Sequence, residues 1–86
     1  MGHFATQDFW ACYHQLPSDV RLEADKSYRL LKANPRHPSL HFKRVNGLWS
    51  VRATRRHRAL GVDVADGIVW FWIGDHAGYE RLIKSA

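Results

Sequence analysis

The chain lacks several features that would assign its class immediately. It has one cysteine, Cys12, among its 86 residues, so it forms no internal disulfide, and we expect the reducing cytoplasm as its compartment. Its longest apolar run, Ile68–Ile73, falls far short of the roughly 20 residues that a membrane-spanning helix needs. The N-terminal MGHFATQ has no charged region followed by an apolar one, so it is no signal peptide. We therefore expect no membrane partner.

The motifs of several enzyme classes are also missing. The sequence has no glycine-rich phosphate loop, no GxSxG and no pair of carboxylates in an obvious site. His37 and His41 flank Pro38 without helical spacing or cysteine and carboxylate companions, so they do not predict a zinc site. We expect no metal and no cofactor, and metal-dependent nuclease chemistry is disfavoured.

Positive charge is abundant, and it is concentrated. The formal charge of +5 and the pI of about 9.9 favour an anionic partner, namely nucleic acid, an acidic protein or a membrane surface. The alternative is a basic surface that only keeps the protein in solution. Clustering favours nucleic acid, because seven cations lie in one central segment: Arg36, Lys43, Arg44, Arg52, Arg55, Arg56 and Arg58.

Hydrophobic periodicity divides the chain into a helical half and a strand half, within one domain spanning residues 1–86. Helices are predicted at Asp8–Gln15 and from Ser18 or Asp19 to Ala33, where Asn34-Pro35 ends the second one. Strands are predicted at Phe4–Ala5, Leu40–Val45, Leu48–Thr54, Arg58–Val64 and Ile68–Gly74, with hairpin turns at Asn46-Gly47 and Asp66-Gly67, a connection at Arg55–His57 and a last helix at His76–Lys84. The predicted class is α+β: two N-terminal helices packed on a mostly antiparallel sheet of four to five strands, with a short C-terminal helix.

Strand alternation turns two arginines to one face of this sheet. In Leu48–Thr54 the apolar positions are Trp49, Val51 and Ala53, and the alternate positions are Ser50, Arg52 and Thr54. We expect the apolar set to face the helices, so Arg52 points to the other face, near Arg58. Two cations there repel each other unless an anion lies between them, and the guanidinium fork matches phosphate oxygens. The alternative is that each arginine pairs with an acid such as Asp63 or Asp75.

A histidine and a tyrosine follow the last strand. His76 and Tyr79 are three residues apart, so they share a face if a helix begins there. A histidine can give or take a proton near neutral pH, and a tyrosine can stack on a base or orient a phosphate. The alternative is that His76 caps the helix and Tyr79 is a core aromatic. His57 is either an accessory proton donor or a solvated loop residue.

The order of elements and the segments FKRV-NG-LWSVR, HRALGV and IVWFWIGDHAGYERLI resemble the RelE/ParE superfamily of type II toxin–antitoxin toxins. The similarity covers nearly the whole chain. It implies the microbial RNase-like fold of these toxins and, for RelE-like members, metal-independent cleavage of mRNA on the ribosome, which inhibits translation. In that reaction the RNA 2′-hydroxyl attacks the adjacent phosphate and leaves a 2′,3′-cyclic phosphate and a free 5′-hydroxyl.

The resemblance also implies roles for particular residues. Arg52 matches the second of two basic positions in the strand after the turn, and Arg58 matches the arginine that opens the next strand and stabilises charge on the phosphate. His76 and Tyr79 match the C-terminal functional region in its HxxY form. Ser50 departs from the pattern, because it replaces the first basic position and removes one expected contact.

Further cations are expected to bind the RNA. The resemblance matches Lys43 and Arg44 to a basic strand that touches the RNA backbone, and the predicted RNA-binding set is Lys43, Arg44, Arg55, Arg56 and His57. Two other functions remain open: inhibition of DNA gyrase, as in ParE-like members, and a binding module without activity. In each case we expect a cognate antitoxin as partner, with operator DNA bound only through the antitoxin complex.

Overall fold

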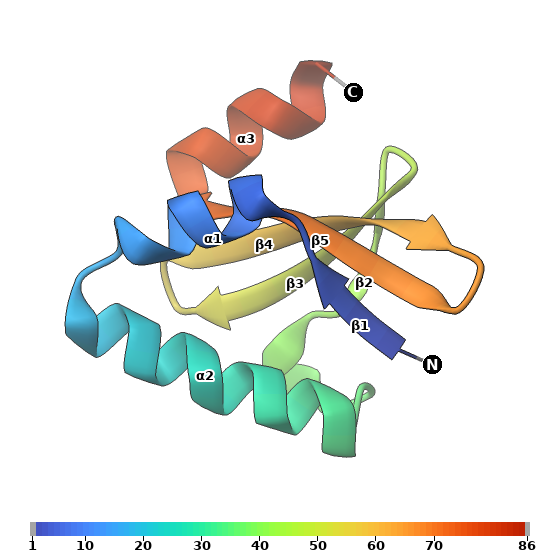
Figure 1. Ribbon diagram of the computed structural model, residues 1–86, viewed down its shortest axis with the longest axis horizontal. Coiled ribbons are helices and arrows are strands. Elements are labelled where there is room, and N and C mark those ends of the chain that lie inside the picture. Colours follow the sequence, from blue (N-terminus) through green and yellow to red (C-terminus); the bar gives the residue numbers. More distant parts are fainter. Residues whose placement is uncertain (1, 86) are drawn as a thin grey trace.

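Three α-helices and a five-stranded sheet form residues 2–85, which are the residues that the structure, a computed structural model, describes (Figure 1). In chain order the elements are β1 (Gly2–Ala5), α1 (Gln7–His14), α2 (Ser18–Ala33), a short 3-10 helix η1 (Pro38–Leu40), β2 (Lys43–Val45), β3 (Leu48–Thr54), β4 (His57–Val64), β5 (Gly67–Asp75) and α3 (His76–Ser85). The predicted α+β class is confirmed. No helix within this part of the chain is both long and apolar enough to cross a membrane.

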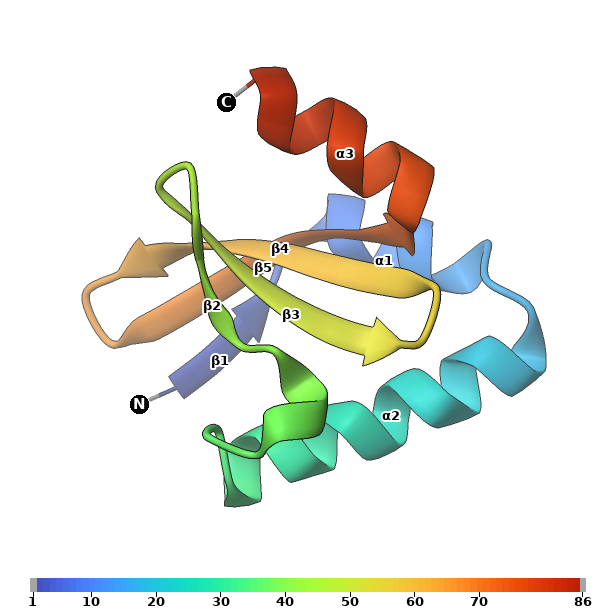
Figure 2. The ribbon, with the colours of Figure 1, turned by 180° about the vertical axis from the view of Figure 1, so that it is seen from behind.

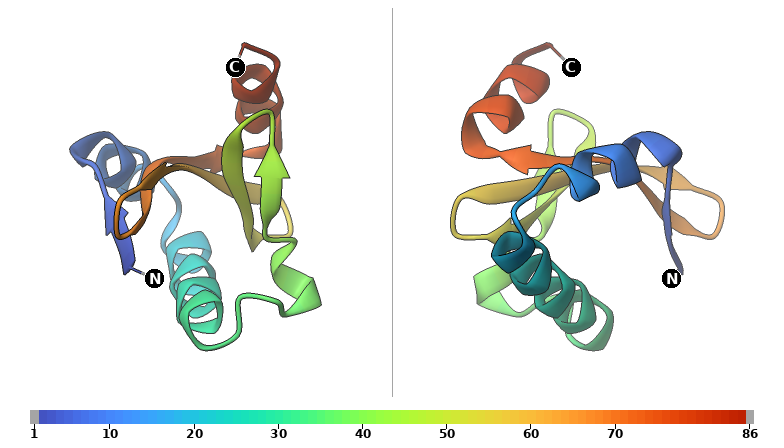
Figure 3. Two further views of the ribbon diagram at one scale, coloured as in Figure 1. Left: turned by 90° about the vertical axis from the view of Figure 1, so that its right-hand side faces the viewer. Right: turned by 60° about the vertical axis from the view of Figure 1, so that its left-hand side comes forward.

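The sheet has the strand order β1-β5-β4-β3-β2, in which β1 runs parallel to β5 and the other neighbours are antiparallel. Strand β5 is therefore internal, which agrees with its run of apolar residues on both faces. Figure 3 shows α2 and α3 on opposite sides of this twisted sheet. Helix α1 packs along β5 and α2 along β3, so the layer on one face consists of two N-terminal helices and the opposite face is left to α3.

The helices begin and end where the sequence gives them signals. The Thr6 hydroxyl accepts a hydrogen bond from the Phe9 N–H at 3.1 Å and caps α1. Helix α2 places Ala24 and Leu31 in the core, and it ends at Ala33 because the residue before Pro35 is forced out of helical geometry.

The first hairpin turn has the predicted geometry. Asn46 and Gly47 both have positive φ, at 51° and 79°, as a two-residue type I′ turn requires. The Asn46 side chain also donates a hydrogen bond of 2.7 Å to the carbonyl oxygen of Ile83 near the end of α3. The hairpin tip, visible from behind in Figure 2, thus holds the C-terminal helix against the sheet.

Three predicted boundaries were wrong. The strand predicted at Leu40–Val45 begins only at Lys43, because Leu40 closes η1 and His41 takes the left-handed conformation, with φ of 46°. The connection predicted at Arg55–His57 is a shorter turn, since His57 already pairs with Asp75 as the first residue of β4. Strand β1 is longer than predicted and begins at Gly2, where it pairs with Gly67.

Candidate functional site

The site begins with two arginines that face each other across neighbouring strands. Arg52 of β3 and Arg58 of β4 are cross-strand partners. They form the next pair after Ser50 and Leu60 on the same face of the sheet. Val51 lies on the other face and is buried in the core beneath the helices. Strand alternation therefore places Arg52 and Arg58 opposite Val51, on the face that α3 covers, as the sequence predicted. Arg52 also borders a cavity on the helical face.

Backbone groups, not acids, hold the Arg58 guanidinium. Its Nη1 donates to the carbonyl oxygens of Thr54 at 3.1 Å and His57 at 3.0 Å, at the turn between β3 and β4. Burial, and secondarily the charge of Arg52, lower the pKa of Arg58 from its ordinary value. Its hydrogen bonds to the turn therefore hold the Arg58 guanidinium in place despite the repulsion from Arg52.

The acids proposed as partners for these arginines are engaged elsewhere. Asp63 accepts hydrogen bonds from Arg44 and from the Trp49 indole at 2.8 Å, and Asp75 accepts one from the Gly78 N–H at 2.9 Å. Within residues 2–85, neither Arg52 nor Arg58 forms an ion pair with a carboxylate. The alternative of simple surface ion pairs was wrong, and the two guanidinium groups remain available to an anion.

Helix α3 brings His76 to the rim of this face. Asp75 caps the helix through Gly78, so His76 is its first residue and not its cap. The His76 backbone N–H donates to the Arg56 carbonyl oxygen at 3.0 Å, which ties the start of α3 to the turn that also holds Arg58. The His76 ring is exposed, with Nε2 3.0 Å from a Glu80 carboxylate oxygen.

Tyr79 lies beneath His76 and is only 6 % exposed. Its ring centre is 5.6 Å from that of His76, and its hydroxyl oxygen accepts a hydrogen bond of 3.0 Å from the Ser50 hydroxyl. Ser50 itself is 2 % exposed. A ring this buried has little surface for stacking on an RNA base. The Tyr79 hydroxyl is held against β3 by its hydrogen bond with Ser50.

The sequence did not predict the role of Ser50 in the site. It was interpreted as a lost phosphate contact, but the structure places it under α3 as the hydrogen-bond partner of Tyr79. The only signal in the sequence was a hydroxyl at a position that alternates with buried apolar residues.

The remaining predicted RNA-binding residues are not all on one face. Lys43 pairs with Ser50 and lies on the site face, whereas Arg44 pairs with Trp49 on the helical face. The Arg44 guanidinium lies 4.4 Å from the Trp49 ring centre and is bonded to Asp63. Adjacent strand residues point to opposite faces, so the structure brings Lys43 to the arginines and keeps Arg44 away from them.

The turn between β3 and β4 carries the other three predicted residues. Arg55 and Arg56 are exposed there, and His57 is half-buried with Nδ1 2.8 Å from the Thr54 hydroxyl. All three adjoin Arg58 and the start of α3, so they extend the positive surface at this end of the site. Among residues 2–85, no three His, Cys, Asp or Glu side chains gather closely enough to hold a metal ion.

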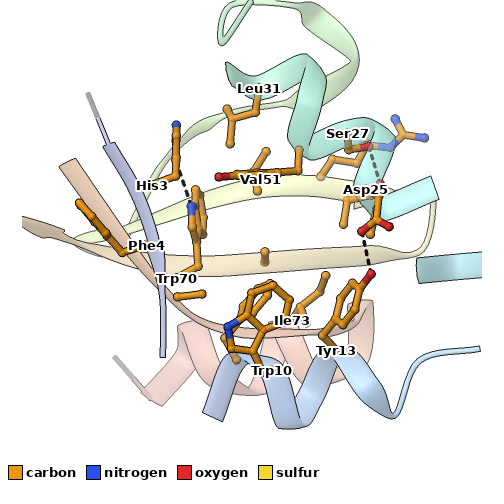
Figure 4. A pocket seen from close by; sticks show the side chains of 17 residues that line it. His3, Phe4, Trp10, Tyr13, Asp25, Ser27, Leu31, Val51, Trp70 and Ile73 are labelled. Carbon is orange, nitrogen blue, oxygen red and sulfur yellow. Dashed lines mark hydrogen bonds between the residues drawn. The ribbon is translucent and has the colours of Figure 1, made fainter. Parts of the chain in front are cut away.

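A separate apolar cavity of about 220 Å³ opens on the helical face, between α1 and α2 (Figure 4). His3, Trp10, Tyr13 and Trp70 line it, and polar contacts close its edges: Trp70 donates to His3 at 3.1 Å and Tyr13 to Asp25 at 2.7 Å. Of the predicted site residues only Arg52 reaches its lining.

The comparisons with known proteins agree with this architecture. The model of the ParE-like toxin domain family matches residues 18–81. The RelB–RelE antitoxin–toxin complex from Methanococcus jannaschii contains a chain that is similar to this one with a TM-score of 0.70 at 10 % identity, covering 92 % of this chain and 96 % of that chain. The YoeB/ParE toxin from Agrobacterium tumefaciens is similar with a TM-score of 0.65 at 18 % identity, covering 88 % and 99 %. No curated protein matches the chain in sequence.

Fold and family model together define a small α+β toxin of the RelE/ParE type. The chain belongs to the ParE-like toxin family, and therefore to the RelE/ParE superfamily that its sequence resembled. The isolated RelE toxin from E. coli is similar as well, with a TM-score of 0.61 at 11 % identity, and it covers 98 % of this chain and 97 % of its own. At these identities the solved structures establish the fold, and activity must be argued from the site.

Proposed function

We propose that this toxin is a metal-independent endoribonuclease that cleaves mRNA on the ribosome and so stops translation. The observation that carries the proposal is the pair of arginines, Arg52 and Arg58, facing each other without a carboxylate partner in residues 2–85. Such a pair favours a phosphate between them, because the anion relieves their repulsion and accepts their hydrogen bonds.

The neighbouring side chains suit the chemistry of RNA cleavage. As the 2′-hydroxyl attacks, negative charge builds on the phosphate oxygens, and fixed guanidinium groups stabilise it without further rearrangement. His76 is exposed at the rim, where it can transfer a proton, and the Tyr79 hydroxyl below it orients the substrate. No cofactor takes part, and the cytoplasm is the proposed compartment.

The phosphate backbone on either side of the cut would follow the positive surface. Lys43 lies on the site face at one end, and Arg55, Arg56 and His57 lie at the β3–β4 turn at the other. Contacts of this kind position the RNA without reading its sequence.

A cleavage assay on translated mRNA tests the proposal. Purified wild-type protein is added to a reconstituted translation reaction, and cut sites are mapped by primer extension beside His76→Ala and Arg58→Ala, each checked for folding by circular dichroism. We expect cuts only on translated message, with rates lowered about 100-fold or more in both variants. Uncut message with wild-type protein, or full cutting by both folded variants, would contradict the proposal.

Lys43 and Arg44 supply a matched pair of variants for the same assay. Lys43→Ala removes a cation from the site face and should weaken RNA binding and its dependence on salt. Arg44→Ala removes the same charge from the helical face, so we expect its cleavage rate to match that of the wild type. Equal losses in the two variants would mean that only net charge matters.

We further propose a cognate antitoxin as protein partner, with operator DNA bound through that complex. One matched solved structure is a RelB–RelE complex and another is the RelBE2 toxin–antitoxin complex from Mycobacterium tuberculosis. The net charge of +5 and the exposed Phe4, Trp10, Leu22 and Tyr28 suit an acidic, amphipathic partner.

Inhibition of DNA gyrase is the second candidate, and the observation that favours it is the match to a ParE-like family model. A supercoiling assay with purified gyrase and excess wild-type protein separates the two functions. Blocked supercoiling together with uncut message would move the assignment to gyrase and make the arginine face a docking surface.

A further inference from the structure

Cleavage of RNA by its own 2′-hydroxyl requires two proton transfers, and the site as proposed above contains one group for them. One proton must leave the 2′-oxygen and another must reach the departing 5′-oxygen. The inference developed here rests on the proposed nuclease function. Among residues 2–85, no carboxylate contacts Arg52 or Arg58, and Glu80 is bonded to His76. No carboxylate is therefore placed beside the two arginines to serve as the second proton-transfer group.

Within the described residues, His41 is the one side chain that lies within hydrogen-bond distance of the Arg52 guanidinium. Its Nε2 lies 3.4 Å from Nη1 of Arg52, at the edge of β3 that the short strand β2 leaves uncovered. Sequence reasoning considered this histidine only as a zinc ligand and rejected that role for lack of suitable companions. Nothing in the spacing indicated that His41 approaches Arg52.

The backbone holds His41 in an unusual conformation. Its φ of 46° is left-handed, which is uncommon for a residue with a side chain and is found more often at functional sites. Both neighbours are anchored: Leu40 is 1 % exposed, and the Phe42 ring stacks on Trp49 at 4.6 Å. The exposed imidazole is thus carried on a backbone that packing fixes from both sides.

The two histidines make contacts with opposite requirements. A guanidinium can only donate, so the hydrogen bond to Arg52 forms only when Nε2 of His41 carries no proton. A carboxylate only accepts, so the contact of His76 with Glu80 forms when Nε2 of His76 carries one. The contact with Arg52 thus favours an unprotonated Nε2 on His41, and the contact with Glu80 favours a protonated Nε2 on His76.

Their positions place the arginines between them. Across the sheet the order is His41, Arg52, Arg58 and then α3 with His76, and the two arginines are direct cross-strand partners. Directly paired strand residues have Cβ atoms about 5 Å apart, and the charge of Arg52 acts on Arg58, so the two side chains begin close enough to bind one phosphate together. A phosphate bound there has a histidine on either side.

We propose that His41 is the general base of the cleavage reaction and that His76 is its general acid. His41 Nε2 takes the proton of the 2′-hydroxyl as Arg52 turns from the imidazole to the phosphate. The bond between the 2′-oxygen and phosphorus forms, the bond between phosphorus and the 5′-oxygen breaks, and His76 gives its proton to the 5′-oxygen. The products are the cyclic phosphate and the 5′-hydroxyl, and both histidines return to their starting states by exchange with water.

The first arm of the test separates a base from a residue that merely holds Arg52. His41→Gln retains an acceptor near the place of Nε2 but cannot take a proton, whereas His41→Ala removes both properties. We expect both variants to cut ribosome-bound mRNA at least about 100-fold more slowly than the wild type. His41→Asn serves as a second variant because asparagine tolerates the left-handed backbone, and His37→Gln, in the same loop, should cut at the wild-type rate.

The second arm separates base from acid. An mRNA with sulfur in place of the bridging 5′-oxygen at the cut site has a leaving group that needs no proton. We expect this RNA to restore cutting by His76→Ala to within about tenfold of the wild type, and to leave His41→Ala slow. Wild-type cutting by His41→Gln, or rescue of His41→Ala by the sulfur RNA, would overturn the inference and leave the nuclease assignment intact. Failure of wild-type protein to cut natural mRNA would refute both.

Discussion

The hydrogen bond between Ser50 and Tyr79 should show strong energetic coupling. Both residues are buried, at 2 % and 6 % exposure, and their hydroxyls are 3.0 Å apart. Tyr79→Phe leaves the Ser50 hydroxyl without its partner, and Ser50→Ala does the same to the Tyr79 hydroxyl. A buried polar group that loses its partner costs about 1–3 kcal/mol, whereas removing both partners can be nearly neutral.

We therefore expect each single variant to lose about 1–3 kcal/mol in free energy of unfolding and the double variant to lose clearly less than the sum. For a domain of this size, 1 kcal/mol corresponds to about 4–8 °C in Tm. Urea unfolding followed by tryptophan fluorescence measures all four proteins of the cycle.

The matched control for this cycle is another serine hydrogen bond, which is partly buried. The Ser27 hydroxyl donates to the Ala53 carbonyl oxygen at 2.6 Å, on the opposite face of the sheet. Ser27→Ala should combine additively with Tyr79→Phe, because the two sites share no partner. Additive losses for Ser50→Ala and Tyr79→Phe, within about 0.5 kcal/mol, would refute the predicted coupling between the two hydroxyls.

Two further predictions concern the core. Burial, with a smaller contribution from the charge of Lys32, lowers the pKa of His3 in the folded protein, so the unfolded chain binds this proton more readily. The contribution of His3 to the free energy of unfolding should therefore be constant above about pH 6.5 and fall below it. In thermal melts, His3→Gln should reduce the fall in Tm at acidic pH. Gly61→Ala should lower stability by about 1–3 kcal/mol in urea unfolding, because its Cβ would lie 2.7 Å from Ile68 and 2.9 Å from Trp70, and unchanged stability would show that the sheet shifts freely there.

Much of the fold could be predicted because local signals and burial agree. The change of period after Asn34-Pro35 separates helices from strands, and Asn46-Gly47 fixes the register of the first hairpin. The segment Pro38–Phe42 could not be predicted this way. Its apolar residues suggest a strand, but Leu40 and Phe42 reach the core from a 3-10 turn and a left-handed residue, which no periodicity describes.

The site could be predicted only in part, for a related reason. Alternation correctly paired Arg52 with Arg58, and it would also have separated Lys43 from Arg44 had it been applied to β2. The contact of His41 with Arg52 depends on how a loop crosses the open edge of β3. Such contacts arise from tertiary packing between segments, so the spacing of residues in the sequence does not predict them.

The distribution of acids explains why the site face remains positive. Asp25 is bonded to Tyr13 and Asp63 to Arg44, and both contacts lie on the helical side of the sheet. Asp63 and Asp75, the acids that the sequence suggested as partners for Arg52 and Arg58, are thus held by other groups, and the charge of Arg52 still acts on Arg58 in the free protein. An anion that binds there gains its own hydrogen bonds and also relieves this repulsion. Relief of the repulsion between Arg52 and Arg58 therefore contributes to the free energy with which a polyanion binds. Added salt screens the same repulsion, so it should weaken polyanion binding and also stabilise the free protein.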